Sequence, residues 1–548
     1  MKQRGTAMTF CLVVMALLVM LSVGAGGLAG TSLSLARSDR RNAIAFQVAQ
    51  GALELGVTDE VAALQVSKGV FNSATFTYTD TMSAAVPGCT ATVSVSADAT
   101  KTYAWVTSTA TYDGKTKSIR TLIKAKDVGI WNNAIFAGTG ASGQSINGNV
   151  DIRGSVHILG DGEAYTDLNH NGNWDAAESF TDSNHNGVWD PGEPFVDANG
   201  DGVWNPAEPY NDTNGNGVYD PPLTTTQLAD SMSGSANIGN NYTGMSSSLE
   251  SLISAAPKIN GLEDLQTEVR VKHGEIGISG SAQIGYNGAQ DNGTSKGTVA
   301  GMYVNDGYTG NQGASHVFSD NGTTNTYDLG TLGITMPLIS GIGADTYTDS
   351  NNTTWTNEYA YLQSRSLTVN VGTVTSTTTA FSYGPDAYGN SISFTPKNGS
   401  TPCELTVNGV VRINGNIQIG SKDSIYYAGR GTIFAEGNIN VDGDLLPSAG
   451  LSFPKTTAIG LLAKGNMNLA TGNGSSQLSL AGAFYAQGTI KSAKQNQIAG
   501  TFVANYFDMG TNVPSIYQVP DLPKYMPPAM PGDKSYISMK LKSWRERQ

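Results

Sequence analysis

The segment from residue 167 to residue 222 contains four copies of a 15-residue unit rich in Asp, Asn and Gly. The units begin at Asp167, Asp182, Asp197 and Asp212 and follow, in whole or in part, the pattern D-x-[DN]-x-[DN]-G-x-x-[DN]-x-x-E. Such a loop offers side-chain oxygens at positions 1, 3, 5, 9 and 12 and a backbone carbonyl at position 7. These donors suit calcium, a hard cation that takes about six to eight oxygen ligands.

Three of the four units are complete. Gly172, Gly187 and Gly202 occupy position 6, where the chain turns sharply. The predicted ligands of the complete units are Asp167, Asn169, Asn171, Asn173, Asp175 and Glu178; Asp182, Asn184, Asn186, Val188, Asp190 and Glu193; and Asp197, Asn199, Asp201, Val203, Asn205 and Glu208. Many of these ligands are Asn, so we expect weak sites with dissociation constants of roughly 10⁻⁴ to 10⁻³ M.

The fourth unit lacks the carboxylate of position 12, because Leu223 stands there. Its other predicted ligands are Asp212, Asn214, Asn216, Val218 and Asp220. We therefore expect this unit to bind calcium weakly or not at all.

Fifteen residues are too few for a helix–loop–helix in every unit, so consecutive loops are expected to abut as an insertion that projects from the body. Aromatic residues recur in register and are predicted to form a thin apolar spine; they are Trp174, Trp189, Trp204 and Tyr219, then Phe180, Phe195 and Tyr210. Without metal, clustered carboxylates repel and the segment should disorder. The alternative is an acidic linker that binds no specific ion.

Charge is concentrated in this segment. The chain has 45 acidic and 32 basic residues, and 13 of the acids lie within residues 161–222, which contain no Lys or Arg. Acids and bases balance elsewhere, and no basic stripe is present to neutralise phosphates. Nucleic acid is therefore not expected as a partner.

The N-terminal segment can cross a membrane. Residues 7–28 are apolar and long enough to span as a helix, and the preceding Lys2 and Arg4 favour a cytoplasmic N-terminus. Ile44, Val48, Leu55 and the alanines between them continue one apolar stripe at helical spacing. The alternative is a cleaved secretory signal with its cleavage site near Gly30. Either way, the body is expected outside the cytoplasm.

The remaining sequence is typical of β structure. Glycine is abundant, at 66 residues, and residues 90–96, 103–112 and 116–125 alternate as strands do. Asp113-Gly114 predicts a hairpin in a small antiparallel sheet. Residues 403–510, and similarly 133–160, repeat short apolar runs with Gly or Asn between them, which predicts a right-handed β-solenoid, with a β-sandwich as the alternative. Residues 223–402 are rich in Ser, Thr, Gly and Asn and are hardest to interpret.

No catalytic motif is recognisable. The chain has five His residues, and the HExxH motif and the phosphate-binding loop GxxxxGK[ST] are absent from the sequence. Of the three cysteines, Cys89 and Cys403 could pair in an oxidising compartment, but no spacing requires it. We expect a protein without enzymatic activity. An enzyme acting on envelope polysaccharide is an alternative, because β-solenoids host such activities.

The N-terminal region resembles PilX-type minor pilins of the type IV pilus system. Arg4-Gly5, the apolar run and the stretch LARSDRRNAIAFQVAQGALELG carry this resemblance over residues 1–57. It implies a prepilin leader cut after Gly5, with Thr6 as the new N-terminus. Phe10 departs from the Glu of most pilins at this position. The tail VPSIYQVPDLPKYMPPAMPG, residues 513–532, is similar to PilX-like assembly proteins, and the acidic repeats resemble dockerin or thrombospondin type 3 calcium ladders.

Together these features predict a mainly β protein with seven segments. The protein would be a calcium-stabilised pilus or adhesion component of the cell envelope. Its partners would be the inner membrane, other pilin-like subunits or the pilus assembly machinery, and a surface glycan or protein; a pilus-independent surface adhesin is the alternative. The segments are a leader and helix at 1–57, a pilin-like α+β body at 58–130, first solenoid rungs at 131–164, the calcium repeat at 165–222, a β-rich region at 223–402, a solenoid at 403–512 and an extended Pro-rich tail at 513–548, whose basic end, residues 540–547, should be solvated.

Overall fold

The computed structural model describes residues 4–67, 69–98, 101, 103–139, 145–287, 294–472, 477–508 and 514–547. The chain separates into two compact units. The first, here called the helical unit, comprises Met1–Val128 and Ser535–Gln548, and the second, here called the body, comprises Gly129–Lys534. Lys2, used above to orient the N-terminus, lies outside the described residues.

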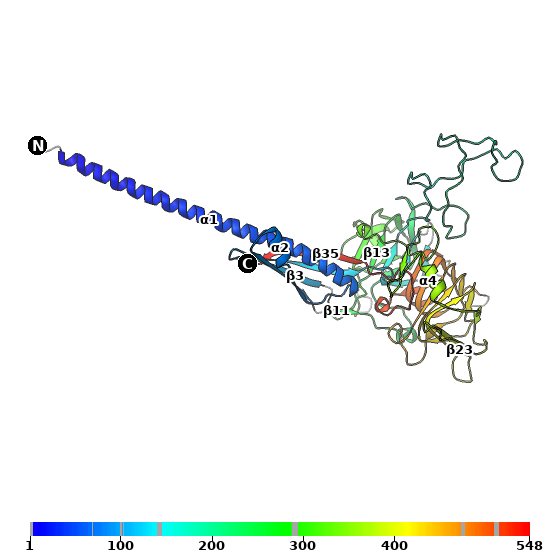
Figure 1. The fold of residues 1–548 in the computed structure, drawn as a ribbon. Helices are drawn as coiled ribbons and strands as arrows, with labels where there is room; N and C mark the ends of the chain where they lie inside the picture. The colour runs from blue at the N-terminus through cyan, green and yellow to red at the C-terminus, as the bar shows by residue number, and fades with distance from the viewer. Residues whose placement is uncertain are drawn as a thin grey trace. The chain divides into compact units, whose positions relative to one another are not determined.

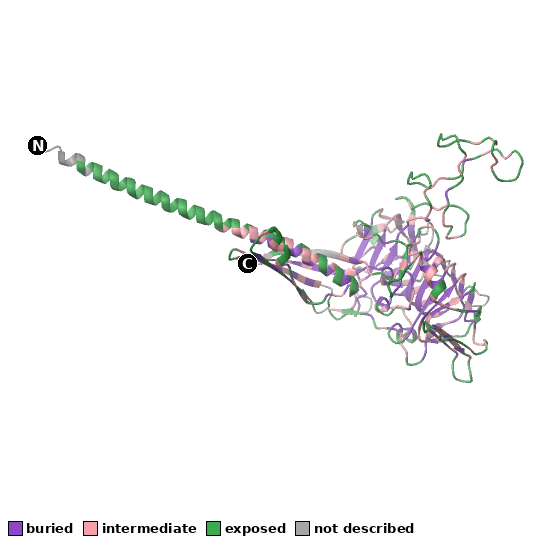
Figure 2. Cartoon of the chain, viewed as in Figure 1, coloured by how far each residue is buried: buried purple, intermediate pink, exposed green. Residues whose placement is uncertain are grey.

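Helix α1 runs without interruption from Arg4 to Val66 (Figure 1). Its described side chains from Met8 to Leu35 are exposed (Figure 2), and an 18-residue window has a mean hydropathy of 2.4 with no residue buried. By length and composition this part can cross a membrane, although a signal sequence meets the same criterion. Gly5 and Thr6, the predicted processing residues, lie in the first helical turn.

The second part of α1 is amphipathic and packs on an antiparallel sheet. Ala45, Val48, Ala49 and Ala52 are buried along one stripe, as the helical spacing predicted. The small residues allow the helix to approach the sheet closely. At Gly56 the approach is so close that an added Cβ would lie 2.6 Å from Cγ1 of Val93.

The sheet of the helical unit has the strand order β1-β2-β3-β4-β35, with every neighbouring pair antiparallel. The predicted hairpin at Asp113-Gly114 is present, with φ values of 46° and 75° at the two turn residues. The small antiparallel sheet predicted from the sequence is thus confirmed. The elements are β1 (Ala74–Thr77), α2 (Thr79–Ala85), β2 (Cys89–Ala97), β3 (Tyr103–Tyr112), β4 (Lys115–Asp127) and β35 (Ile537–Arg547).

Strand β35 corrects the prediction of a solvated basic tail. It pairs with β4 from Ile537 opposite Asp127 to Arg547 opposite Ser118, and Ile537 is buried. Alternation in this stretch is masked by its many charged residues, and its partner lies about 400 residues away, so sequence reasoning missed it. The body is therefore an insertion between two adjacent strands of one sheet.

The body is built on parallel strands arranged in three rows. Within each row, every strand is hydrogen-bonded to the next as the chain coils. The first row runs β20 (Leu367–Val369), β24 (Glu404–Ile413), β27 (Arg430–Ala435), β30 (Ala458–Ala463), β32 (Ser479–Ser492), β33 (Gln497–Asp508), β5 (Ile135–Ala137), β8 (Val156–Ile158), β13 (Glu268–Val271) and β16 (Gly301–Val304).

The other two rows share β32 and β33 with the first, because these long strands continue from row to row. The second row runs β21 (Thr373–Val374), β25 (Ile417–Ile419), β28 (Ile439–Val441), β31 (Met467–Leu469), β32 and β33. The third row runs β24, β26 (Ile425–Ala428), β29 (Leu445–Pro447), β32, β33, β34 (Ser515–Tyr517), β7 (Asp151–Arg153), β10 (Asn237–Gly239) and β15 (Gln283–Ile284).

Stacked apolar residues form the core of the body. One column of paired, buried side chains passes through the first row; in order it contains Val411, Ile433, Leu461, Phe484, Phe502, Ile135, Val156, Val269 and Met302. Phe502 therefore pairs with Ile135. The chain enters the stack in its middle, winds to one end by residue 304, crosses to the other end and winds back from residue 367.

These parallel rows differ from the antiparallel pairs of a β-sandwich. They also differ from a simple series of separate solenoid rungs, because β24, β26, β29, β32, β30 and β27 close a ring of parallel pairings. The ring closes because β24 and β32 each bridge two rows. The sequence did not predict this ring, because a strand that continues around a corner has no sequence signal of its own.

Smaller elements complete the body. A four-stranded parallel sheet has the order β17-β14-β9-β6. The hairpin β22–β23 extends the third row next to β24. The bounds are η1 (Ile130–Asn132), β6 (Ser145–Gly148), β9 (Leu228–Gly234), α3 (Ser247–Glu250), β11 (Lys258–Ile259), β12 (Leu262–Glu263), β14 (Glu275–Ile278), β17 (Tyr308–Thr309), η2 (Gly313–His316), η3 (Gly330–Leu332), β18 (Tyr347–Thr348), β19 (Thr354–Trp355), α4 (Glu358–Arg365), β22 (Phe381–Tyr383), β23 (Ser391–Thr395) and η4 (Leu522–Lys524).

Candidate functional site

The acidic segment 161–222, here called the arm, lies between β8 and β9 and forms neither helices nor extended strands. We name its loops by sequence order: loop 1 (167–175), loop 2 (182–190), loop 3 (197–205) and loop 4 (212–220). Each loop curls through two left-handed residues, at positions 4 and 6. Position 4 is His170, His185, Gly200 or Gly215, and position 6 is always Gly.

One hydrogen-bond pattern recurs in all four loops. The carboxylate of the first Asp accepts the backbone N–H groups of positions 5 and 6, at 3.1–3.2 Å and 2.8–2.9 Å respectively. Oδ1 of the third residue accepts the N–H of position 5, and Oδ1 of the fifth accepts the N–H of position 7. Side-chain oxygens from the whole loop thus turn toward its inside.

A glutamate completes every loop in the same way. In each case one carboxylate oxygen accepts the N–H of position 2 at 2.7 Å, and the other accepts the N–H of position 9 at 3.0–3.2 Å. The glutamate's own N–H donates to the carbonyl of position 9. Loop 1 receives Glu208, loop 2 receives Glu193, loop 3 receives Glu178 and loop 4 receives Glu163.

This arrangement corrects two predictions. Glu178 and Glu208 were expected to complete their own units, but they exchange places between loops 1 and 3; only Glu193 completes the unit to which it belongs. Loop 4 was expected to lack a carboxylate, and Glu163 supplies one from upstream of the repeat. A sequence signal existed: Glu-x-aromatic recurs every 15 residues from Glu163 onward.

The cause of the exchange is that the arm is a nested hairpin. Antiparallel bridges join Tyr165 to Tyr210 and Phe180 to Phe195. Aromatic rings pack between the loops so joined, with Trp174 stacked on Tyr219 at 4.7 Å and Trp189 on Trp204 at 5.3 Å between centroids. The predicted aromatic spine is present as two small clusters instead of one continuous row.

The donor chemistry of the loops fits calcium. Each loop gathers carboxylate, amide and carbonyl oxygens and no sulfur, as a hard cation requires. Asn173, Val188, Val203 and Val218, at position 7, have exposed side chains, which suits residues whose only predicted contribution is the carbonyl. Among the described residues, no group of three or more His, Cys, Asp and Glu side chains lies close enough together to hold a metal.

The base of the arm is fixed to the rest of the body. The side chain of Asn211 donates to the carbonyl of Ile342 and accepts its N–H, at 2.6 and 3.2 Å. Tyr506, on β33, donates to Oδ2 of Asp220. Glu163 is 3% exposed, and its burial raises the pKa of its carboxyl group. Loop 4 is thus the loop that contacts the body.

The remaining candidate residues from the sequence are the three cysteines. Cys11, Cys89 and Cys403 are all free thiols, and Cys89 and Cys403 are buried. Cys403 donates to the carbonyl of Ser424. No disulfide joins the cysteines in the described chain.

No family model matches the chain. No curated protein matches it either. Among solved structures, the chain is similar to the competence-associated pilin ComZ from Thermus thermophilus, with a TM-score of 0.49 and 18% sequence identity over 92% of this chain and 97% of that chain. This likeness is too weak to transfer a function.

Proposed function

We propose that this chain is a non-catalytic, membrane-anchored component of a type IV pilus system, of the PilX minor-pilin type. In this proposal α1 is held by the inner membrane and then by other pilin-like subunits or the assembly machinery. The body is displayed outside the cytoplasm, where it contacts a surface glycan or protein. Calcium stabilises the arm.

The proposal rests mainly on the difference between the exposed, apolar first part of α1 and the packed second part. Large apolar side chains such as Phe10, Met20 and Leu28 are 70–72% exposed, whereas the following part of the same helix is buried against the sheet. An apolar surface of this extent is not tolerated in water and requires a lipid or protein partner. A continuous helix can be anchored at one end while its other end holds a folded unit.

Calcium binding rests on the oxygen donors of the four loops. In each loop, a network of backbone hydrogen bonds turns the predicted ligands toward the inside of the loop. When bound, the cation would neutralise the carboxylates that otherwise repel within each loop. The predicted ligand set is extended by Glu163 for loop 4.

The N-terminus of the mature protein tests the pilus proposal. Mass spectrometry of the protein from membrane and sheared-surface fractions should give Thr6 as the first residue, with the apolar helix retained. A start near Thr31 would indicate an ordinary secretory signal and remove the basis for a pilus role. An uncut helix confined to the membrane fraction would favour a pilus-independent surface adhesin.

A further inference from the structure

We propose that the four loops form one linear series from the body outward, in the order loop 4, loop 1, loop 3, loop 2, and that cation binding at each loop favours binding at its neighbours in this series. The inference rests on the proposed calcium binding. It differs from the tandem arrangement that the sequence repeat suggests, in which loop 4 would neighbour loop 3.

The inner link joins loops 4 and 1. Their glutamates, Glu163 and Glu208, flank the bridge between Tyr165 and Tyr210, where Thr166 donates to the carbonyl of Pro209. A shift of this short ladder would move both glutamates together. Cation binding at either loop therefore orders a ligand of the other.

The middle link joins loops 1 and 3 by exchange. The N–H of Glu208 donates to the carbonyl of Asp175 in loop 1, and the N–H of Glu178 donates to the carbonyl of Asn205 in loop 3, both at 3.0 Å. Glu208 follows loop 3 in sequence and Glu178 follows loop 1. Neither loop can bind a cation through all its ligands unless the other is in place.

The outer link repeats the inner one. Glu178 and Glu193, which complete loops 3 and 2, flank the bridge between Phe180 and Phe195. Val196 donates to the carbonyl of Ser179 next to this bridge. Loop 2, which uses its own Glu193, closes the series at the outer end.

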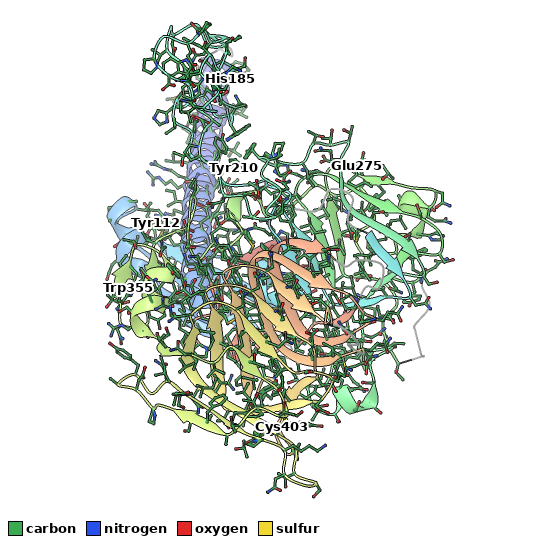
Figure 3. The ribbon with its side chains drawn as sticks, turned by 90° about the vertical axis from the view of Figure 1, so that its right-hand side faces the viewer. Tyr112, His185, Tyr210, Glu275, Trp355 and Cys403 are labelled. Atoms are coloured by element: carbon green, nitrogen blue, oxygen red, sulfur yellow. The ribbon has the colours of Figure 1, made fainter. Side chains whose placement is uncertain are left out.

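The ends of the series are distinct in the structure. In Figure 3, Tyr210 lies beside the strands of the body, and His185, in loop 2, lies at the outer end of the arm. Tyr210 and Asp212 line a pocket together with Lys464 and Gln487 of the body. The inner end is thus held by the folded body, whereas the outer end depends on the links between loops.

Hydrogen–deuterium exchange of the full-length protein in detergent, during a calcium titration, tests this order with peptides that report each loop. The variants Asp212→Asn and Asp182→Asn weaken the two terminal loops, with Ala at the same positions as a second pair. We expect Asp212→Asn to raise the calcium midpoint of loop 1 by about 5-fold or more, and that of loop 2 least. Asp182→Asn should raise the midpoint of loop 3 most and that of loop 4 least.

The outcomes separate the order of the loops from calcium binding itself. In a tandem array, Asp212→Asn would raise mainly the calcium midpoint of loop 3, and Asp182→Asn would raise the midpoints of loops 1 and 3 equally. This result would overturn the proposed order. Unchanged midpoints in all other loops would overturn the coupling. If no loop of the unmodified protein gains protection with calcium, the calcium proposal itself fails. Unchanged exchange in peptides from β27 and β30 confirms that a variant is folded.

Discussion

The hydroxyl group of Tyr506, on strand β33 of the body, donates a hydrogen bond of 3.0 Å to Oδ2 of Asp220, the ninth residue of loop 4. The same carboxylate oxygen accepts the amide groups of Asn214 and Asn216. A residue of the core stack thus orients a predicted calcium ligand almost 300 residues earlier in the chain.

Replacing Tyr506 by Phe should weaken loop 4 selectively. A hydrogen bond to a carboxylate contributes about 1 to 2 kcal/mol, so the calcium midpoint of loop 4 should rise roughly 5- to 30-fold. Hydrogen exchange in residues 212–223 during a calcium titration measures this midpoint. Tyr383→Phe removes a hydroxyl from an exposed ring and serves as the control. An equal effect of the two variants would contradict a role for Tyr506 in positioning Asp220.

Replacing Glu163 by Gln should remove one of four calcium sites. The amide keeps the shape of the side chain but loses its negative charge and one oxygen ligand, and both of these strengthen the binding of a divalent cation. Equilibrium dialysis with radioactive calcium should show one fewer ion bound. Glu250→Gln, at an exposed position of the body, is the matched control. Four ions bound by the Glu163 variant would show that loop 4 does not use this carboxylate.

Removal of calcium should unfold the arm and leave the strand stack intact. The arm has little apolar core beyond its aromatic clusters, and its carboxylates repel without a cation. Limited proteolysis in a chelator should cut within residues 167–220 and leave the flanking fragments stable. Calcium, but not magnesium at equal ionic strength, should restore resistance. Identical digestion patterns with and without chelator would argue that the arm is held without metal.

Glu358 should make the stability of the body depend on pH. Its side chain is 7% exposed, Oε1 has no partner among the described residues, and burial raises its pKa from 4.5 to about 8. The folded state therefore retains a proton that the unfolded state releases, and stability falls as pH rises from about 4.5 to about 8. The cost at alkaline pH is on the order of 5 kcal/mol.

Thermal unfolding of the Glu358→Gln variant across this pH range checks the sign. The amide cannot ionise, so the variant should match the original protein near pH 4.5 and exceed its melting temperature above pH 8. A constant difference at every pH would mean that Glu358 does not titrate in this range.

Gly56 and Gly51 offer a matched pair on the packed half of α1. A Cβ at Gly56 would lie 2.6 Å from Cγ1 of Val93, whereas one at Gly51 would contact Sδ of Met82 at an ordinary 3.5 Å. Gly56→Ala should destabilise the helical unit by about 1 to 3 kcal/mol. Gly51→Ala should instead stabilise it by up to about 1 kcal/mol, because Ala is the better helix former. Chemical denaturation measures both, and the same sign for both variants would contradict this packing.

Local patterns in the sequence predicted local structure well. The apolar run and the helical stripe around Val48 indicated α1, and Asp113-Gly114 between alternating segments indicated the β3–β4 hairpin. The contacts that sequence reasoning missed join distant segments. Nothing in residues 537–547 indicates that they pair with β4, and nothing in Phe502 or Ile135 indicates that the stack joins there.

The candidate site shows the same difference between local structure, which the sequence predicts, and contacts between distant segments, which it does not. The D-x-N-x-N-G spacing predicted the loops, and the internal hydrogen bonds of all four follow from it. Which glutamate binds each loop depends on how the arm folds back, and the spacing of the repeat does not determine this. Glu193 was assigned to its loop because it lies three residues beyond Asp190, whereas Glu163 lies 57 residues before Asp220, to whose N–H it binds.

The insertion of the body between β4 and β35 has a mechanical consequence. Two covalent connections, Val128–Gly129 and Lys534–Ser535, join the units, and they leave the sheet at the same end of an antiparallel pair. A tensile force on the body, with α1 held fixed, is shared by both strands and pulls them in the same direction. The component of such a force along the strands shears the ladder between β4 and its other neighbour, β3, along its length instead of peeling one strand from the other. The connection is therefore suited to withstand traction.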